Sequence, residues 1–317
     1  MIPRIHVNNI TNLLITKHQS GLIIKTIIFL LFVSVKNISF AQNYETYYLL
    51  CNKADSLKFY EKKLEALATY KTAFQSVHFI HTDKLRKAYD LAIKTNSFED
   101  AFDFGKNILL NTGNQELIQT KSRVFRKSSY YKMMMDSCIH FQTECNNRIN
   151  HPFIKIIDSL VFVDQYIIRN NKSYKANYKI DIKKLPENLF DLDSSNWHLL
   201  YNCIKKWGFP SEDHVGYETY KKAWAILHHN LRLIENEKYH SEIFEYIKSG
   251  DYLPEDVLVW YEQFQQQNYG KTFFTTWDGN LSDENLARIE KNRRMFYLKG
   301  LDSYYLEKNG RYMKAKW

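Results

Sequence analysis

The chain has 317 residues, of which 44% are hydrophobic, so it is long enough for two folded domains and too apolar for global disorder. It contains only 10 Gly and 5 Pro, which excludes a turn-rich β-sandwich or barrel and favours long helices with short connections. The formal net charge is +9. Because the lysines are scattered among acidic residues, a solvated surface explains this charge better than an acidic partner such as nucleic acid or a membrane surface.

An export signal of bacterial type is predicted at the N-terminus. Lys25 precedes an apolar run over residues 27–35, and the small residues Ser39 and Ala41 follow at the −3 and −1 positions of a cleavage site. The run is about half of the ~20 residues that a membrane-spanning helix needs, so we expect cleavage after Ala41 rather than a membrane anchor. Removing residues 1–41, with their four basic residues and no acidic one, lowers the net charge from +9 to +5. The mature protein is therefore expected to be periplasmic or secreted, without an integral membrane span.

Residues 42–150 are predicted to form helical hairpins with a repeat-like pattern. Ala54 is followed by Ala66 at +12, Tyr70 at +16 and Ala73 at +19. This spacing resembles the tetratricopeptide repeat, in which small residues lie where two antiparallel helices touch and an aromatic residue fills the next gap. The resemblance implies a concave face that binds a peptide or a protein.

A second, weaker copy of the pattern follows. Its small and apolar positions are Leu85, Ala88, Ala92 and Ala101. Ala66 and Ala101 are 35 residues apart, close to the usual repeat of about 34 residues, but Gly105 and Ile108 depart from the pattern. Because at least three repeats are generally needed for an independent solenoid, a plain helical layer that supports the rest of the chain is an open alternative.

Residues 151–317 are predicted to form a second helical domain with little or no β-structure. A helix is expected over residues 153–169, and the alternation over residues 174–182 predicts a strand or an extended loop. Asp193 or Ser194 is expected to cap the next helix, which Gly208 and the proline after it should end. Further helices are predicted over residues 221–234, after Pro254 and from about Ser282.

An ordered set of short motifs runs through this second half. It consists of Asp164-Gln165 with Arg169, Asp193-x-x-Asn196, Gly208-Phe209-Pro210, His228-His229, and Asn292-Arg293. The set resembles a bacterial domain family of unknown function, whose members show Asp-Gln-x-x-Arg, Gly-Trp-Pro, a helix ending in Gln-His, and Tyr-Gly-Thr-Gln. Here Arg169 is one residue late, Phe209 replaces Trp and His228 replaces Gln. The family carries no activity that could be transferred.

A polar cluster built from these motifs is the candidate site. The candidate catalytic residues are His229, Asp164 and Arg293, with His229 as a general base, Asp164 fixing its tautomer and Arg293 holding an anionic group. Candidate ligand-binding residues are Gln165, Asn196 and His228. The alternative is a buried network whose members satisfy one another and only fix helix packing.

No metal site and no cofactor is predicted. Adjacent His228 and His229 diverge on a helix and cannot chelate a metal together, and no phosphate-binding Gly-x-x-x-x-Gly-Lys-Ser/Thr loop is present. The four cysteines lack Cys-x-x-Cys spacing, which favours free buried thiols, although pairing between helices stays open.

Two functions are compatible with these patterns. The first is an exported interaction module that binds a protein or peptide in the cell envelope. The alternative is a hydrolase-like or small-ligand-binding domain that uses the buried His/Asp/Arg cluster, so whether the protein is an enzyme stays open.

Overall fold

The computed structural model describes most of the chain after residue 42. The described residues are 43–162, 189–229, 237–258, 261–262, 283–298, 305–308 and 311–314, with backbone alone at 189–194, 228–229, 237–240, 283 and both strands. Asn43–Trp317 groups into one compact unit. The export signal and Asp164, Gln165 and residues 174–182 lie outside the described residues.

Two antiparallel helical hairpins open this unit. The first joins α2 (Tyr44–Phe59) to α3 (Lys63–Phe74), and the second joins α4 (Thr82–Lys94) to α5 (Phe98–Thr112). Glu61 and Asn96 each adopt a φ of 59°, a left-handed backbone conformation that lets the chain reverse within a few residues. The predicted small and aromatic contact positions are all 0% exposed: Ala54, Ala66, Tyr70, Ala73, Leu85, Ala88, Ala92 and Ala101.

The departure from the repeat pattern at Gly105 has a local cause. A Cβ atom at Gly105 would collide with the sulfur of Met134, which is 0% exposed. Met134 belongs to α7 (Ser129–Asp136), so a side chain from a later helix occupies the space that an aromatic side chain fills in the first hairpin. The neighbouring Met133 is 45% exposed, as expected when consecutive residues of a helix point in different directions.

Short helices complete the first half of the unit. They are η1 (Gln115–Ile118), α6 (Arg123–Arg126), α7 and α8 (Cys138–Arg148). Phe125 of α6 is fully buried, and its ring lies 5.3 Å from that of Phe98 and 6.0 Å from that of Tyr89. The aromatic contacts therefore fasten α6 to the second hairpin.

The second half is also helical. Residues 151–162 are helical, and the following elements are α10 (Leu189–Trp207), α11 (Glu212–Val215), α12 (Tyr217–His229), α13 (Glu237–Ser249) and α15 (Asp283–Met295). Strands β1 (Tyr305–Lys308) and β2 (Arg311–Lys314) form one antiparallel pair. The mainly α fold with little β-structure is thus confirmed. The predicted cap at Asp193 or Ser194 is wrong, because α10 begins earlier, at Leu189.

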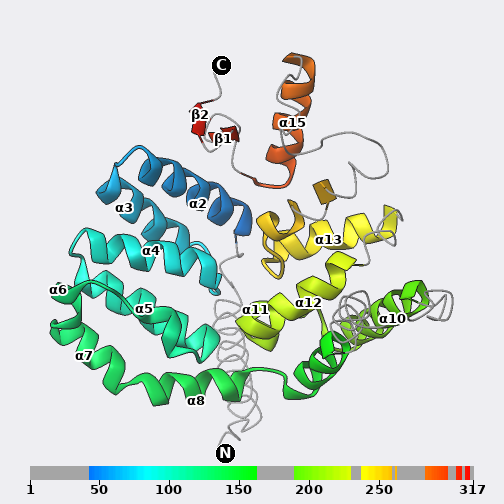
Figure 1. The fold of residues 1–317 in the computed structure, drawn as a ribbon, viewed down its shortest axis with the longest axis horizontal. Coiled ribbons are helices and arrows are strands. Elements are labelled where there is room, and N and C mark those ends of the chain that lie inside the picture. Colours follow the sequence, from blue (N-terminus) through cyan, green and yellow to red (C-terminus); the bar gives the residue numbers. More distant parts are fainter. Residues whose placement is uncertain are drawn as a thin grey trace, which may run out of the picture. The chain divides into compact units, whose positions relative to one another are not determined.

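Helices from the two halves pack side by side. Figure 1 shows the hairpins α2–α5 on one side and α11, α12 and α13 beside them.

Within the described ranges, no helix combines the length and the apolar character that crossing a membrane requires. The boundary predicted between residues 150 and 151 stays a prediction.

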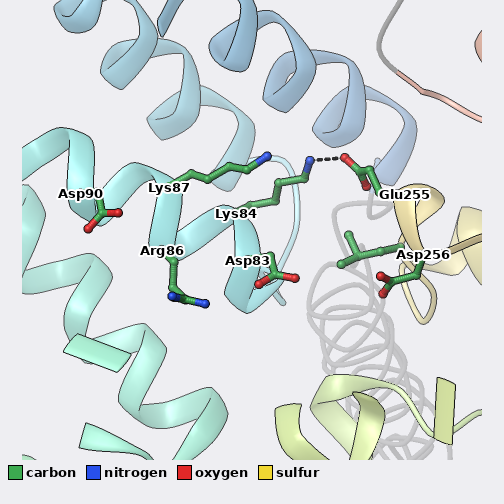
Figure 2. A pocket seen from close by; sticks show the side chains of 8 residues that line it. Asp83, Lys84, Arg86, Lys87, Asp90, Glu255 and Asp256 are labelled. Atoms are coloured by element: carbon green, nitrogen blue, oxygen red, sulfur yellow. Dashed lines mark hydrogen bonds and ion pairs between the residues drawn. The ribbon is translucent and has the colours of Figure 1, made fainter. Parts of the chain in front are cut away.

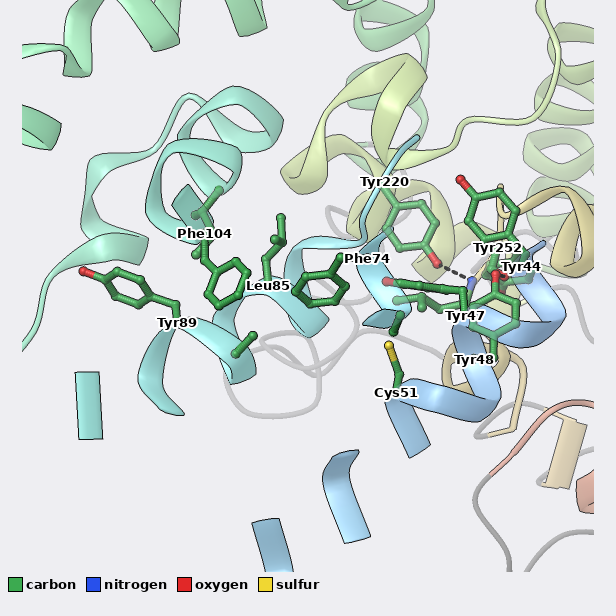
Figure 3. Close-up of a cluster of buried hydrophobic side chains, with 14 of the residues drawn as sticks. Tyr44, Tyr47, Tyr48, Cys51, Phe74, Leu85, Tyr89, Phe104, Tyr220 and Tyr252 are labelled. Carbon is green, nitrogen blue, oxygen red and sulfur yellow. Dashed lines mark hydrogen bonds between the residues drawn. The ribbon is translucent and has the colours of Figure 1, made fainter. Parts of the chain in front are cut away.

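Buried tyrosines connect the halves (Figure 3). The hydroxyl of Tyr48 in α2 donates to the carbonyl oxygens of Ile247 at 3.1 Å and Tyr252 at 3.3 Å. Within the second half, Tyr220 of α12 accepts a hydrogen bond of 3.3 Å from the amide of Leu253. Each phenol thus brings an apolar ring into the core while its hydroxyl satisfies a polar group there.

Candidate functional site

A seam forms where α2 and α4 face residues 209–229 and 237–258. At its centre, the backbone amide of Thr82 donates a 2.9 Å hydrogen bond to Oε2 of Glu212. Oε1 of the same carboxylate lies 3.5 Å from Nδ1 of His81, and both side chains are 0% exposed. The imidazole lies among the rings of Tyr44, Tyr47, Tyr48 and Phe79. The centre of the seam is therefore closed to solvent.

A charged pocket of about 320 Å³ opens further along the seam (Figure 2). One wall is α4, which contributes Asp83, Lys84, Arg86, Lys87 and Asp90. The opposite wall is formed by Leu253, Glu255 and Asp256. We call this cavity the seam pocket. It exists only because the two halves fold against each other.

Lys84 joins the two walls. Its ammonium forms an ion pair with Glu255 and lies 4.0 Å from Asp55 of α2, while its own side chain is only 3% exposed. Burial alone would lower the pKa of Lys84, but the carboxylates of Glu255 and Asp55 raise it. Burial likewise opposes ionisation of Glu255, yet Lys84 holds the pKa of that carboxyl below its usual value. The pair is thus charged at neutral pH.

Asp55 is shared by several donors behind this pair. Lys87 binds it at 2.8 Å, and the hydroxyl of Tyr70 donates to its other oxygen. Although burial would raise the pKa of Asp55, Lys84 and Lys87 lower it. Tyr70, the aromatic position of the first hairpin, therefore also anchors a carboxylate of the network.

Lys221 of α12 makes a second connection across the seam. Its ammonium lies 3.2 Å from Asp83 and 3.4 Å from Asp256. Hydroxyls complete the arrangement, with Tyr217 donating to Asp83 at 2.9 Å and Tyr220 to Asp256 at 2.6 Å. The network therefore fixes both carboxylates in position.

The two carboxylates around Lys221 respond to it differently. Burial would raise the pKa of Asp83, but Lys221 and the Tyr217 hydroxyl hold it below the usual value. At Asp256 burial dominates and the pKa is raised in spite of Lys221. A pair of carboxyl groups with opposite shifts is an arrangement that acid–base chemistry uses.

Two charged side chains at the rim of the pocket make no ion pair within the described ranges. Arg86 and Asp90 are exposed, and neither forms a side-chain hydrogen bond or ion pair with any residue in the described ranges. Figure 2 shows both pointing away from the Lys84–Glu255 pair. They are the pocket residues most available to a ligand.

None of the candidate catalytic and ligand-binding residues predicted from the sequence is among the described residues that line the seam pocket. Asn196 lies in α10, is 6% exposed, and its Nδ2 has no hydrogen-bond partner among the described residues. Arg293 lies in α15 and is 1% exposed. These two helices lie apart in Figure 1. His228 and His229 are the last residues of α12, and their side chains lie outside the described part of the chain. Asp164 and Gln165 also lie outside it. The predicted cluster stays a prediction.

Sequence reasoning missed the seam network. Glu255 and Asp256 follow Pro254, where acidic residues are ordinary in the first turn of a helix. Lys84 and Asp83 are 171 and 138 residues from their respective partners Glu255 and Lys221, so no local pattern indicates the pairing. The one available signal is the run of charges along α4, which a solvated helix face would also produce.

No group of three or more metal-binding side chains comes together within the described ranges. The sequence matches no protein-family model, and neither a curated protein nor a solved structure is similar to it. The fold and the seam pocket are therefore the basis for inferring function.

Proposed function

We propose that the mature protein is an exported helical module of the cell envelope that binds a short peptide in the seam pocket. One observation carries this proposal: an open cavity of about 320 Å³ is lined by charges of both signs, contributed by both halves of the unit. Clefts of this size between packed units are common ligand sites.

The helical hairpins favour a function in binding a ligand. The seam limits the places where a ligand can reach these hairpins. In repeat proteins, stacked hairpins present a binding surface. Here α2 and α4 are instead contacted by residues of the second half, through Tyr48, Thr82 and Lys84. A ligand that approaches these two helices would meet them at the seam pocket.

The charges favour a zwitterion such as a peptide with free termini. Arg86 can hold a carboxylate through its planar guanidinium, and Asp90 can hold an ammonium group. Four of the eight lining residues are acidic, which disfavours a polyanion in this pocket. Charged groups already paired across the seam keep the pocket in shape before a ligand arrives.

Calorimetric titration with tripeptides tests the proposal. Trialanine with free termini should bind, whereas its acetylated and amidated form should bind at least about tenfold more weakly, since one charge-assisted contact is worth about 1.5–3 kcal/mol. Arg86→Ala and Asp90→Ala should each weaken binding by a similar factor. Lys155→Ala, which removes an exposed cation that does not line the pocket, is the matched control. No binding of free trialanine, or equal binding by all variants, would refute the proposal.

A hydrolytic function is the second candidate, and the opposite pKa shifts of Asp83 and Asp256 support it. In this case Asp256 would donate a proton and Asp83 would remain ionised. Incubation of peptide probes followed by mass spectrometry would detect products. Cleavage that survives Asp256→Asn would exclude this acid.

Export can be tested on the whole chain. Expressed in a bacterium, the protein should accumulate outside the cytoplasm with Gln42 as its first residue, as read from the intact mass. Substituting Ala41 by Lys should block cleavage, because the −1 position requires a small side chain. Cytoplasmic accumulation of the uncleaved chain would contradict this part of the proposal.

A further inference from the structure

Folding gathers cations that are scattered in the sequence. Three segments meet at one edge of the hairpin layer, namely the α2–α3 turn (58–64), the α4–α5 turn (94–98) and the segment around α6 (121–127) (Figure 1). Glu61 and Lys94 interact electrostatically, which connects the first two turns. The rings of Phe98 and Phe125 are 5.3 Å apart, which connects the second turn to α6. We call these three segments together the turn edge.

The turn edge has a larger net positive charge than the whole mature chain. It contains eight basic residues and a single acidic one: Lys58, Lys62, Lys63, Lys94, Lys121, Arg123, Arg126 and Lys127, against Glu61. Its net charge of +7 exceeds the +5 of residues 42–317, so the remainder of the mature chain is slightly acidic. Basic residues that are scattered among acidic ones along the sequence are therefore concentrated at this edge of the folded chain.

The cations of the α6 segment are free to meet a partner. Lys121, Arg123, Arg126 and Lys127 are all exposed. None of them forms a side-chain hydrogen bond or ion pair with the rest of the described chain. Uncompensated cations concentrated on one face attract polyanionic surfaces.

Apolar side chains project from the same edge. Leu64 is 69% exposed and Val124 is 64% exposed. Phe59 and Tyr60 of the first turn are 45% and 49% exposed. Aliphatic and aromatic side chains ringed by Lys and Arg are the composition of surfaces that enter the interface of an anionic bilayer. Nucleic acid would use the cations but offers no hydrocarbon for Leu64 and Val124.

We propose that the turn edge docks the protein onto the surface of an anionic phospholipid membrane. The cations contact the headgroups while Phe59, Leu64 and Val124 enter the headgroup–acyl boundary. The seam pocket is lined by residues 83–90 of α4 and residues 253–256, none of which belongs to the turn edge, so this inference is independent of the peptide-binding proposal.

Vesicle co-sedimentation of the full exported protein tests the docking. Vesicles of phosphatidylcholine with about 30% phosphatidylglycerol should bind the protein, and pure phosphatidylcholine vesicles should bind it weakly. Binding should fall steeply when salt is raised to about 0.5 M, where charges are screened within a few ångström. Each cation near an anionic surface contributes about a fivefold factor, so Lys121→Ser, Arg123→Ser, Arg126→Ser and Lys127→Ser combined should weaken binding at least about 100-fold.

A control variant with the same loss of charge distinguishes binding through the turn edge from binding through the overall positive charge of the protein. Lys53, Lys155, Lys206 and Lys291 are exposed cations outside the turn edge, and their combined change to Ser removes the same charge. It should weaken binding by less than about tenfold. Leu64→Ser with Val124→Ser should remove the part of the binding that survives high salt. Circular dichroism confirms that each variant is folded.

Three results would overturn the inference. They are no binding to anionic vesicles, equal losses in the two fourfold variants, or binding to a single-stranded oligonucleotide that depends on the α6 cations while vesicles are ignored. The last result would assign the edge to nucleic acid instead.

Discussion

The amide of Thr82 and the carboxylate of Glu212 form a 2.9 Å hydrogen bond although 130 residues separate them. Thr82 is the first residue of α4, and the residue before it, His81, makes no side-chain cap. The Glu212 carboxylate thus satisfies a free amide at the N-terminus of the helix, where a negative charge is also stabilised by the helix dipole. One half of the unit caps a helix of the other.

Loss of this carboxylate should destabilise the fold strongly. Glu212→Ala removes the buried acceptor of the Thr82 amide and leaves His81 without its neighbour, and we expect a loss of about 3 kcal/mol in the free energy of unfolding. Glu212→Gln keeps an acceptor and should lose less. Urea denaturation measures both. Glu65→Ala, which removes an exposed pair with Lys62, should leave the midpoint unchanged, and equal effects of Glu65→Ala and Glu212→Ala would refute the capping role.

Lys84→Met should weaken the contact between the halves. The methionine fills the volume of the buried stem but leaves Glu255 and Asp55 without their shared cation. Because the Glu255 side chain is 45% exposed, it can turn its buried carboxylate towards water once Lys84 is lost. The expected loss is therefore about 2 kcal/mol rather than the larger value of a fully buried pair. Lys71→Met, which breaks an exposed pair with Asp100, is the control. An unchanged denaturation midpoint for Lys84→Met would contradict this prediction.

Stability should fall in acid. The folded-state pKa values of Asp55 and Asp83 are lowered from 3.8, and that of Glu255 is lowered from 4.5. These groups therefore stabilise the fold fully above their unfolded pKa values, and the stabilisation is lost as pH falls below those values and through the lowered folded-state pKa values. Asp256, whose pKa is raised, contributes in the opposite direction.

The contribution of Lys221 can be isolated in the same titration. Lys221→Met removes the cation that lowers the pKa of Asp83, so the variant should be less stable at neutral pH and lose less stability on acidification. Lys222→Met, which removes an exposed pair with Asp158, should keep the wild-type pH dependence. Thermal melts between pH 2 and pH 7 measure the difference, and parallel curves for Lys221→Met and wild type would count against the network.

Gly250 should tolerate no side chain. Its φ is +81°, and an added Cβ would overlap the ring of the buried Tyr44. Gly208 has a similar φ of +87° with nothing within 4 Å of an added Cβ. Gly208→Ala should therefore cost roughly 1–2 kcal/mol from backbone strain alone. Gly250→Ala should cost about 2–4 kcal/mol, because repacking Tyr44 adds to the same strain. Equal melting temperatures for the two variants would contradict this prediction, because they would show that the Tyr44 ring moves aside without an energetic cost.

The cysteines should be unreactive in the folded protein. All four are free and buried, and burial raises the pKa of Cys51 to about 12 and those of Cys138, Cys145 and Cys203 above the usual range. A thiol reagent at about pH 8 should therefore label none of them rapidly, since the thiolate is the reactive form. Unfolding without reductant should release four reactive thiols. A smaller number would reveal a disulfide.

The sequence by itself determined the helical hairpins. The spacing of Ala54, Ala66, Tyr70 and Ala73 is a local property, because residues three or four positions apart share one face of a helix and small ones permit close packing. Scarce Gly and Pro left few places to break the helices. These positions are all fully buried, as the pattern predicts.

Only the tertiary structure decided where charges meet. Lys84 and Glu255, Thr82 and Glu212, and Phe98 and Phe125 lie far apart in the chain, and periodicity carries no information about which helix face covers which. A charged residue on a helix surface looks the same in sequence whether solvent or a distant carboxylate neutralises it. The seam pocket and the turn edge therefore emerge only when the hairpins stack and the second half packs against them, because long-range packing, not local pattern, sets the surroundings of each charge.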